Sequence, residues 1–583
     1  MKNLSALGAL LLMSFQLAQA QTPCGNDLLR QQWIKSNPSI EPKIAAEKKA
    51  WQMHNDRMAT SKMIVSGTDT SYEIPVVVHI IHTGGAVGSI NNPSDGAIDS
   101  FITYINKTWA GTWPYYFDTL HGGTRVPIKF VLAKRSPDCG VTNGINRVNG
   151  NVLSGYNTYG VCPYGTVSGP SDSAVKSLSL WPTRDYFNIW LVNNIENGMV
   201  GGYAPWPWFT GVDLIDGAVV LAQYAVPLFP PNYYVAGPHE LGHSFGLYHT
   251  FQDGCGTGDC VTEGDEVCDT EPHIFSSMAC ETGDINSCTG VLFDSVEFNV
   301  MNYSTCPAML TKGQKKRILY TMKNYRMGLV NSMGVTAPDA SFVSPVLACK
   351  PGVVNVGNGN NNGPCNITFA NMVTSSSGYA DDGRMGYIDR TCIQQGATVV
   401  RGSAYELSVS TIEGAQNVNA WIDYNNDGIF QTTEKVFSHS GSLVDEVHSG
   451  MITIPSAAVV TDKNLRMRIQ ADNAVLGTAC DDLQNGQTED YTVLIKASSG
   501  ITPVATAAKG FNVFPNPATD MVTIETTVPA IFALCSVEGK VVLQENEKQE
   551  INLSALVPGL YFIHVYRKSD HTLLGVQKLI KLN

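Results

Sequence analysis

The stretch HELGHSFGLYH, at residues 239–249, contains three histidines and one glutamate within eleven positions. His239 and His243 are four residues apart, so on a helix both side chains project from one face, one turn apart. Two imidazoles at that separation can share one small cation. Glu240 is rotated by about 100° from His239, which places its carboxylate beside the cation rather than on it. From there it can take a proton from a water molecule that the cation holds.

Gly246 and His249 extend this pattern beyond the helix. Glycine permits a positive φ, so the helix can end at Gly246 and the chain can bring His249 back toward the same cation. Three protein ligands and one open position is the layout of a catalytic zinc site, whereas structural zinc takes four ligands. The alternative is a helix with incidental histidines. A bare H-E-x-x-H arises by chance in about one in fifty chains of this length, and the added glycine and histidine make coincidence far rarer.

The bulk properties limit the class of protein. A chain of 583 residues predicts three or four domains, and a hydrophobic content of 43% is sufficient for well-packed cores. The formal net charge of −13 and the pI near 5.4 argue against a nucleic-acid partner, because no basic face is available to neutralise phosphates. Apart from a short run at the start, no apolar run is long enough to span a bilayer, so no transmembrane segment is expected.

The first twenty residues read as a signal peptide. Lys2 supplies the positive charge, residues 4–15 the apolar core, and Ala-Gln-Ala at 18–20 the cleavage site. A buried N-terminal helix is the alternative. Residues 21–71 are polar and favour helix, which suggests a propeptide or an N-terminal arm.

Residues 72–334 alternate between strand and helix patterns. The β-branched run YEIPVVVHIIHT begins this region, and the segment DGAIDSFITYINKTW has helical spacing. Such alternation predicts an α/β (α+β) domain, with the histidine segment placed after its last strand. The expected strands lie within residues 72–83, 126–135, 186–195 and 217–222.

The remainder of the chain predicts two all-β units. Residues 335–364 end in a run rich in glycine and asparagine and form a linker, and residues 498–510 form a second one. Between them, residues 365–497 show short alternating strands and turn signals, as in a β-sandwich. Residues 511–583 show the same pattern, so the whole chain is expected to be multidomain, with two all-β sandwich-like domains after the α/β domain.

The extended histidine motif is that of the metzincins, and the chain resembles the pappalysin or cytophagalysin family over about residues 73–334. The segments YEIPVVVHIIHT, GINRVNG, FNIWLVNNI, GGYAPWP and DGAVVL resemble its core strands, EGDEVCDTEP its calcium loop and NVMNYS its Met-turn. The resemblance implies a zinc metalloendopeptidase of metzincin-like fold that hydrolyses peptide bonds of protein and peptide substrates and is made as a latent zymogen.

The resemblance assigns roles to individual residues. Glu240 would be the general base, Met301 the hydrophobic floor beneath the metal, and Tyr303 the group that steadies the tetrahedral intermediate. The Met-turn here reads Met-Asn-Tyr where the family often has Met-Asp-Tyr. We expect this difference to alter local hydrogen bonds more than catalysis. The Zn²⁺ ligands would be His239, His243 and His249.

The resemblance also implies a calcium ion in the segment GDEVCDT. Asp265, Thr270 and a carbonyl near Cys268 would supply oxygen ligands, which suit Ca²⁺. A solvated acidic turn is the alternative reading.

Fourteen cysteines fit a compartment outside the cytoplasm. Six fall between positions 255 and 306, two are at 139 and 162, and four are at 349, 365, 392 and 480, so each group is even. By family analogy the expected pairs are Cys260–Cys288, Cys280–Cys306 and Cys255–Cys268.

Cys24 and Cys535 remain outside these groups. Family members can carry a propeptide cysteine whose thiolate blocks the zinc, and the segment TPCGND around Cys24 resembles that switch. A thiolate is a strong ligand for an open zinc position. A disulfide between the two terminal cysteines is the alternative.

The segment WIDYNNDGIFQTTE satisfies the calcium-loop pattern D-x-[DN]-x-[DN]-G-x5-E. Its setting is strands rather than two helices, and a polar β-turn is the alternative. The surrounding unit resembles the GEVED-type β-sandwich, whose function in adhesion or substrate docking the sequence leaves open. The candidate Ca²⁺ ligands are Asp423, Asn425, Asp427 and Glu434.

The tail from FNVFPNP to QKLIKL resembles the C-terminal sorting domain of the type IX secretion system. That resemblance implies a bacterial protein that reaches the cell surface or the medium through the periplasm and outer membrane, with the secretion machinery as a partner. The competing class is a cell-surface binding or adhesion protein that uses the β-sandwich, with the peptidase fold as a scaffold. A decayed enzyme commonly loses its base or a ligand, and this chain retains all of them.

Overall fold

The computed structural model describes much of the chain in separate stretches, which form two compact units, Met1–Ala497 and Ser498–Asn583. The expected signal peptide, residues 1–20, lies outside the described residues. The described residues are 24–36, 38, 40–60, 71–112, 123–208, 216–225, 236–256, 258–275, 283–294, 296–304, 309–338, 342–355, 362–376, 386–412, 414–497, 511–516, 518–526, 529–536, 541–546, 550–554, 556–557, 559–568 and 573–582.

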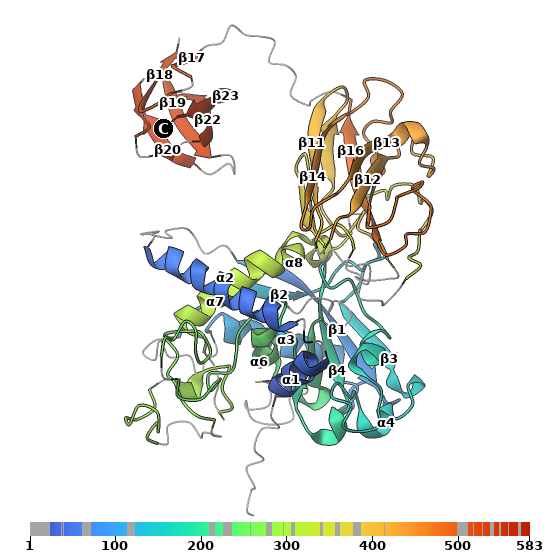
Figure 1. The fold of residues 1–583 in the computed structure, drawn as a ribbon, viewed down its shortest axis with the longest axis vertical. Helices are drawn as coiled ribbons and strands as arrows, with labels where there is room; N and C mark the ends of the chain where they lie inside the picture. The colour runs from blue at the N-terminus through green and yellow to red at the C-terminus, as the bar shows by residue number, and fades with distance from the viewer. Residues whose placement is uncertain are drawn as a thin grey trace, which may run out of the picture. The chain divides into compact units, whose positions relative to one another are not determined.

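A mostly parallel sheet organises the first part of unit 1 (Figure 1). Its strand order in the described residues is β2-β1-β4-β6-β5, with β3 also paired to β1. Every pairing is parallel except that of β5 with β6. This arrangement confirms the expected α/β pattern. The strands are β1 (Tyr72–His82), β2 (Ile128–Leu132), β3 (Ile145–Asn149), β4 (Phe187–Val192), β5 (Gly202–Tyr203) and β6 (Ala218–Leu221).

Helices accompany this sheet. α3 begins after Ser94, whose hydroxyl accepts a hydrogen bond from the Ala97 N–H at 3.3 Å, and it buries Phe101 and Ile105 in the main core. α7 begins with a capping box of Thr311 and Gln314. The helices are α3 (Asp95–Trp109), α4 (Tyr156–Tyr159), α5 (Asp172–Lys176), α6 (Ala236–Ser244), α7 (Lys312–Tyr325) and α8 (Met327–Asn331), with 3-10 turns η2 (Gly150–Val152), η3 (Glu196–Gly198), η4 (Ala222–Ala225), η6 (Val296–Phe298) and η7 (Met333–Val335).

The N-terminal arm is helical, as its composition predicts. It contains α1 (Asn26–Ser36) and α2 (Ile40–Thr60). The α2 residue Trp51 is 3% exposed, and its indole N–H donates to the Glu266 carbonyl at 3.2 Å. The arm is therefore packed onto the α/β part.

The second part of unit 1 is all-β. Two sheets have the orders β10-β16-β15-β12-β13, with β9 on β16, and β14-β11-β7-β8. Side chains of both sheets form one buried cluster, which is the packing that a β-sandwich requires. The elements are β7 (Asn366–Phe369), β8 (Met372–Ser375), β9 (Tyr387–Asp389), β10 (Ala397–Val400), β11 (Ala404–Ser410), β12 (Asn417–Ile422), η8 (Thr432–Glu434), β13 (Lys435–Ser440), β14 (Val447–Thr453), β15 (Asn464–Asp472) and β16 (Gln487–Lys496).

Covalent and ionic contacts join the two parts of unit 1. Cys139 forms a disulfide with Cys392 across 253 residues. Beside it, the fully buried Arg390 donates from Nε to the Asp185 carboxylate at 3.1 Å. A buried ion pair of this kind is costly to break, because removing one partner strands the other charge.

Unit 2 is also all-β. Its sheets have the orders β17-β18-β21 and β20-β19-β22-β23 in the residues that the structure describes. Buried side chains from both sheets again form one cluster. The strands are β17 (Phe511–Phe514), β18 (Met521–Thr526), β19 (Ala530–Ser536), β20 (Val541–Asn546), β21 (Glu550–Asn552), β22 (Gly559–Arg567) and β23 (Leu573–Lys581).

The disulfide pairing differs from the expected one. Two of the expected pairs are wrong, because Cys255 bonds to Cys288 and Cys260 bonds to Cys268. The tight loop between Cys260 and Cys268 brings these two Cα atoms to 5.0 Å, within disulfide reach. The third expected pair, Cys280–Cys306, lies outside the described residues.

The cysteines at 139 and 162 and the four at 349–480 do not pair only within their own groups. Cys139, from the first group, forms a disulfide with Cys392, from the second. Cys349 pairs with Cys480. Within the described ranges, no helix is both long and apolar enough to cross a bilayer.

Candidate functional site

α6 carries the first three residues of the candidate site. It contacts α3, β5 and β6, and every residue along it is buried. His239 and His243 lie one turn apart, with ring centroids separated by 4.9 Å. The helix packs closely on the Met-turn because Gly242 has no side chain. A Cβ there would collide with the Met301 sulfur.

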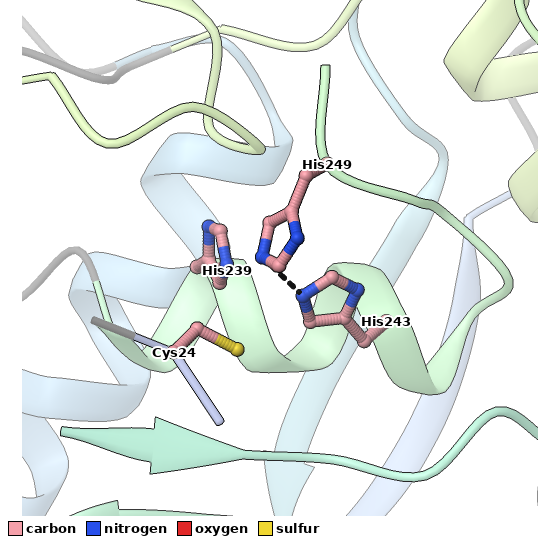
Figure 2. A group of neighbouring side chains, drawn as sticks. All are labelled: Cys24, His239, His243 and His249. Carbon is pink, nitrogen blue, oxygen red and sulfur yellow. Dashed lines mark hydrogen bonds between the residues drawn. The ribbon is translucent and has the colours of Figure 1, made fainter. Parts of the chain in front are cut away.

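Gly246 ends this segment as the spacing predicts. Its φ is 91°, a conformation that glycine adopts without strain. The Leu247 N–H donates back to the Gly242 carbonyl at 3.0 Å, which closes the turn. The chain then returns His249 to within 4.6 Å of His243, measured between ring centroids. The structure therefore brings together all three predicted histidines, as Figure 2 shows.

The three imidazoles present their Nε2 atoms to one point. His239 Nδ1 lies 2.7 Å from the Val300 carbonyl, His243 Nδ1 lies 2.9 Å from the Leu247 carbonyl, and His249 Nδ1 lies 3.1 Å from the Asp27 carboxylate. Each oxygen is an acceptor, so each Nδ1 carries the proton and each Nε2 carries a lone pair.

Those lone pairs face one another. His243 Nε2 and His249 Nε2 are only 3.2 Å apart, and the buried His239 Nε2 has no hydrogen-bond partner among the described residues. Burial, followed by the neighbouring His249, lowers the pKa of His239 to about 3, and burial likewise lowers the pKa of His243. Three imidazoles whose Nε2 atoms converge at this distance need a cation between them, and imidazole nitrogen suits Zn²⁺. The residues present fit the metal that the motif implies.

Cys24 lies at the same point (Figure 2). Its sulfur and the three histidine nitrogens are all within 4.8 Å of one another. Burial, followed by the charge of Glu240, raises the pKa of the Cys24 thiol well above its ordinary value. The protonated thiol donates to Glu240 Oε2 at 3.4 Å. Cys24 forms no disulfide within the part of the chain that the structure describes.

Glu240 is buried beside the histidines, and the structure pairs it with the arm. Burial raises its pKa to about 8, although the hydrogen bond from Cys24 opposes the rise. Backbone contacts hold the arm there, because the Gly25 N–H donates to the Gly202 carbonyl at 2.8 Å and Cys24 forms a parallel bridge with Gly202.

Asp27 is a site residue that the sequence reasoning missed. Its carboxylate accepts from His249 Nδ1 at 3.1 Å. Burial opposes ionisation of Asp27, but the hydrogen bond and charge of His249, with Arg30 nearby, lower its pKa overall. An acidic residue three positions after Cys24 was the only sequence signal, and a contact across 222 residues cannot be inferred from that alone.

The Met-turn lies under the histidines. Met301 is fully buried, and its N–H donates to Asn299 Oδ1 at 2.9 Å. Asn299 in turn exchanges two amide hydrogen bonds with Gln314 of the α7 capping box, at 2.9 and 3.0 Å. The turn is therefore fixed to the start of α7.

Asn302 explains how the Met-Asn-Tyr variation is accommodated. Its Oδ1 accepts from the Tyr303 N–H at 2.8 Å, and its Nδ2 donates to the Val296 carbonyl at 3.1 Å. An aspartate could accept the first bond but could not donate the second when ionised. The variation thus changes a hydrogen bond away from the histidines.

Tyr303 places its hydroxyl 3.2 Å from His249 Nε2. The same hydroxyl lies 3.0 Å from the Cys24 backbone nitrogen and 3.2 Å from its carbonyl oxygen. Burial raises the pKa of this phenol above its ordinary value, so it stays protonated and can donate a hydrogen bond.

The predicted calcium loop around Asp265 contains an uncompensated carboxylate oxygen. Asp265 Oδ1 accepts from Thr270 Oγ1 at 2.7 Å and from the Val267 N–H at 3.1 Å. Its buried Oδ2 has no hydrogen-bond partner among the residues described, and burial raises the pKa of Asp265 to about 7. The Cys260–Cys268 disulfide closes the loop. A buried oxygen without a partner fits the cation that the resemblance implies.

In the second predicted calcium loop, the carboxylates accept hydrogen bonds from backbone N–H groups. Glu434 Oε1 accepts from the Tyr424 N–H at 2.8 Å, and its Oε2 accepts from the Gln431 N–H at 3.0 Å. Asp423 accepts from the N–H groups of Asp427 and Gly428 at 3.2 and 2.8 Å. The backbone already satisfies these carboxylates, so calcium binding at Asp423, Asn425, Asp427 and Glu434 stays a prediction.

Three segments of the chain match family models. Residues 169–323 match the family described as pregnancy-associated plasma protein-A, a group of metallopeptidases. Residues 417–494 match the GEVED domain, and residues 512–581 match the secretion-system C-terminal sorting domain. The sorting domain marks the protein as one that bacteria secrete or display on the cell surface.

Several curated proteins resemble part of the chain. An extracellular metalloprotease of Arthroderma otae is 33% identical over 169 residues, which cover 28% of this chain and 60% of that protein. One of Arthroderma benhamiae is 30% identical over 167 residues, covering 28% and 59%. The chain thus spans about three fifths of the length of these relatives.

Among solved structures, a promirolysin mutant of Tannerella forsythia is 23% identical with a TM-score of 0.39, covering 54% of this chain and 98% of that one. Mature mirolysin of the same organism in complex with a cleaved peptide is 24% identical with a TM-score of 0.36, covering 46% and 98%. By the family matches alone, the chain contains, in chain order, segments similar to the pappalysin metallopeptidases, to the GEVED domain and to a secretion sorting domain.

Proposed function

We propose that this chain is a secreted zinc metalloendopeptidase that is made as a latent precursor and hydrolyses peptide bonds of proteins. The observation that carries the proposal is the convergence of three Nε2 lone pairs, with His243 and His249 only 3.2 Å apart and each ring fixed through Nδ1. His239, His243 and His249 would hold the zinc. An ion held by three histidines retains an open position for substrate or water.

The chain's own groups divide the chemistry. When bound, zinc supplies a Lewis acid that polarises the scissile carbonyl and lowers the pKa of a water molecule. Glu240 takes a proton from the attacking water and passes it to the leaving amine, a role that its position one residue after His239 on α6 suits. Tyr303 donates a hydrogen bond to the oxyanion as charge develops there. Met301 packs beneath the histidines and keeps their helix in place.

Latency is attributed to the N-terminal arm. The Cys24 thiol lies among the histidine nitrogens, where a thiolate would fill the open position of a zinc ion. The same residue hydrogen-bonds Glu240 and Tyr303, so it also occupies the proposed base and the oxyanion donor. Activation would require the arm to leave. The type IX machinery is the proposed export route, in keeping with the sorting domain.

Hydrolysis of casein by the precursor after limited proteolysis of its arm tests the proposal. Glu240→Gln is expected to lose activity by at least about a hundredfold, since general-base catalysis contributes about 10² to 10⁴. Glu73→Gln is the matched control, because Glu73 lies on the surface and pairs with the exposed Lys129. A zinc chelator is expected to abolish activity in wild type and control alike. Chelator-insensitive cleavage, or full activity in Glu240→Gln, would refute the mechanism.

The same experiment distinguishes the proposed peptidase from the alternative function, a surface binding protein. A surface binding protein that uses the GEVED domain, with the peptidase fold as a scaffold, requires no hydrolysis at all. An inactive wild type with intact zinc would favour that function instead.

Calcium binding at Asp265 is proposed as a structural contribution. Asp265, Thr270 and a carbonyl near Cys268 would supply the oxygens. Calcium is expected to raise the Tm of wild type but not of Asp265→Asn, with Asp259→Asn, in an exposed position of the same region, as control. An equal calcium response in Asp265→Asn would rule out this site.

A further inference from the structure

A second cluster of metal-ligating side chains lies where β13 connects to β14. His439 is near the end of β13, His448 near the start of β14, and Glu446 directly before β14. One ligand atom from each of these three residues lies within 4.8 Å of the others. We propose that His439, Glu446 and His448 bind a divalent transition-metal ion, with Zn²⁺ as the ion of choice, independently of the histidine site on α6.

The two imidazoles are oriented toward each other. His439 Nδ1 and His448 Nδ1 are 2.8 Å apart. The other nitrogen of the fully buried His448, Nε2, lies 3.0 Å from Thr411 Oγ1. When that hydroxyl accepts the Nε2 proton, His448 Nδ1 carries the lone pair. Metal-bound histidines are held in this way by an acceptor on their second nitrogen.

Glu446 is oriented by the connecting loop. Its Oε2 accepts from the backbone N–H groups of Ser442 and Leu443, at 2.8 and 2.9 Å. The Glu446 backbone carbonyl accepts from the Thr411 N–H at 2.9 Å. The remaining carboxylate oxygen, Oε1, lies 3.9 Å from His439 Nδ1. One oxygen is thus used by the backbone and the other lies beside the imidazoles.

The ligand types select the ion. Two imidazole nitrogens with one carboxylate oxygen suit Zn²⁺ and its neighbours, whereas Ca²⁺ and Mg²⁺ take oxygen ligands. An ion can reach the site, because the His439 side chain is 41% exposed while that of Glu446 is 13% exposed. Water would complete the coordination on the exposed side.

The position of the cluster gives the ion a structural effect. β13 pairs with β12 in one sheet, and β14 pairs with β11 in the other. His439 and His448 therefore lie on edge strands of two different sheets that share one buried core. An ion between them would crosslink the two sheets. It would raise the free energy of unfolding by an amount set by the ion concentration relative to its Kd.

Zinc content of the full chain tests the proposal. Wild type, His439→Gln, Glu446→Gln and the control His82→Gln are equilibrated with buffered Zn²⁺, desalted and measured for zinc per chain by mass spectrometry. His82 is a partly exposed histidine of β1 outside both clusters. We expect His439→Gln and Glu446→Gln to carry about one zinc fewer than wild type and His82→Gln. Casein hydrolysis by the activated variants is expected to stay at the wild-type level, which shows that the lost ion is not the one on α6.

A second measurement covers the folded state of the variants. Without zinc, His439→Gln is expected to melt close to the wild-type temperature, since the side chain is partly exposed and packs little into the core. With zinc, its Tm should rise by less than that of wild type and His82→Gln. Equal zinc content and equal zinc-induced shifts in all four proteins would overturn the proposal and reduce the histidine pair to a hydrogen bond.

Discussion

Asp27 Oδ2 lies 3.1 Å from His249 Nδ1, so the first turn of α1 hydrogen-bonds the ring of the third proposed zinc ligand. With Cys24 among the same nitrogens, the arm contacts the site through both a thiol and a carboxylate. Removal of the arm would therefore also remove the acceptor that orients His249. The arm is part of the site in this state, and its anchoring can be measured.

Substitution of Asp27 by asparagine is expected to loosen that anchor. A neutral amide loses the charge-assisted part of the hydrogen bond, which for this partly exposed side chain is worth about 1 kcal/mol, or roughly a fivefold change in an equilibrium. Hydrogen exchange of the α1 amides should accelerate by about that factor. Glu41→Gln, at an exposed position in the first turn of α2, serves as control. Unchanged α1 protection in Asp27→Asn would show that the carboxylate does not hold the arm.

Trp51 anchors the second helix of the arm. The Arg317 guanidinium carbon lies 5.3 Å from the centroid of the Trp51 ring. The centroid of the Tyr320 ring also lies 5.3 Å from that of Trp51. Trp51→Ala is expected to cost about 3 kcal/mol of packing at this contact. Limited proteolysis should then cut the arm many times faster. Met53→Ala, on the same helix with a side chain 48% exposed, should behave like wild type. Equal cleavage of the two variants would contradict a packed α2.

Because His79 is buried in its neutral form, we expect the free energy of unfolding to fall in acid. It is fully buried beside Asn188, with its Nε2 2.8 Å from Asn188 Oδ1, and burial lowers its pKa from 6.5 to about 4. The unfolded chain takes up a proton near pH 6.5 while the folded chain does not, so stability is full above pH 6.5 and declines toward pH 4. The contribution lost between pH 7 and pH 5 is at most about 2 kcal/mol.

Urea unfolding of the α/β part at both pH values checks this. His79→Gln should show a smaller difference between pH 7 and pH 5 than wild type, whatever its stability at pH 7. His82→Gln, on the same strand, should keep the wild-type difference. An identical pH response in wild type and His79→Gln would mean that His79 does not titrate in this range.

The Cys139–Cys392 disulfide is expected to stabilise the contact between the α/β and GEVED parts. Its loss should cost about 2–4 kcal/mol, since it closes a long loop. Cys139→Ser, Cys392→Ser and the double variant should lower the Tm equally, because each removes the same bond. Losses that add in the double variant would show that the two thiols act separately.

Much of the fold follows from local patterns. The β-branched run at 72–83 and the helical spacing at 95–109 correspond to β1 and α3 almost residue for residue. The strand β5 could not be predicted, because two residues are too few to show a periodic pattern. It is nevertheless the strand with which Cys24 of the arm forms a bridge. The position of a strand within a sheet depends on long-range pairing, which local patterning does not contain.

The site divides in the same way. His239, His243 and His249 could be placed because a helix and one glycine turn fix their relation within eleven residues. Asp27 could not, because its contact depends on the docking of the arm. The prediction of the disulfide pairs was wrong for a related reason. Six cysteines allow fifteen connectivities, and only the folded loop selects among them. His439 and His448 also meet only after two sheets pack.

The parallel bridge between Cys24 and Gly202 has a consequence for the proposed latency. Within the described residues β5 is an edge strand, and the arm takes backbone positions there that an extended substrate of the proposed peptidase could otherwise use by strand addition. While the arm is covalently joined to the domain, its effective concentration at that edge is in the range of millimolar. One cut in the connecting chain turns the arm into a separate ligand whose occupancy falls with dilution. Under the proposed latency, dilution would then complete the activation that cleavage begins.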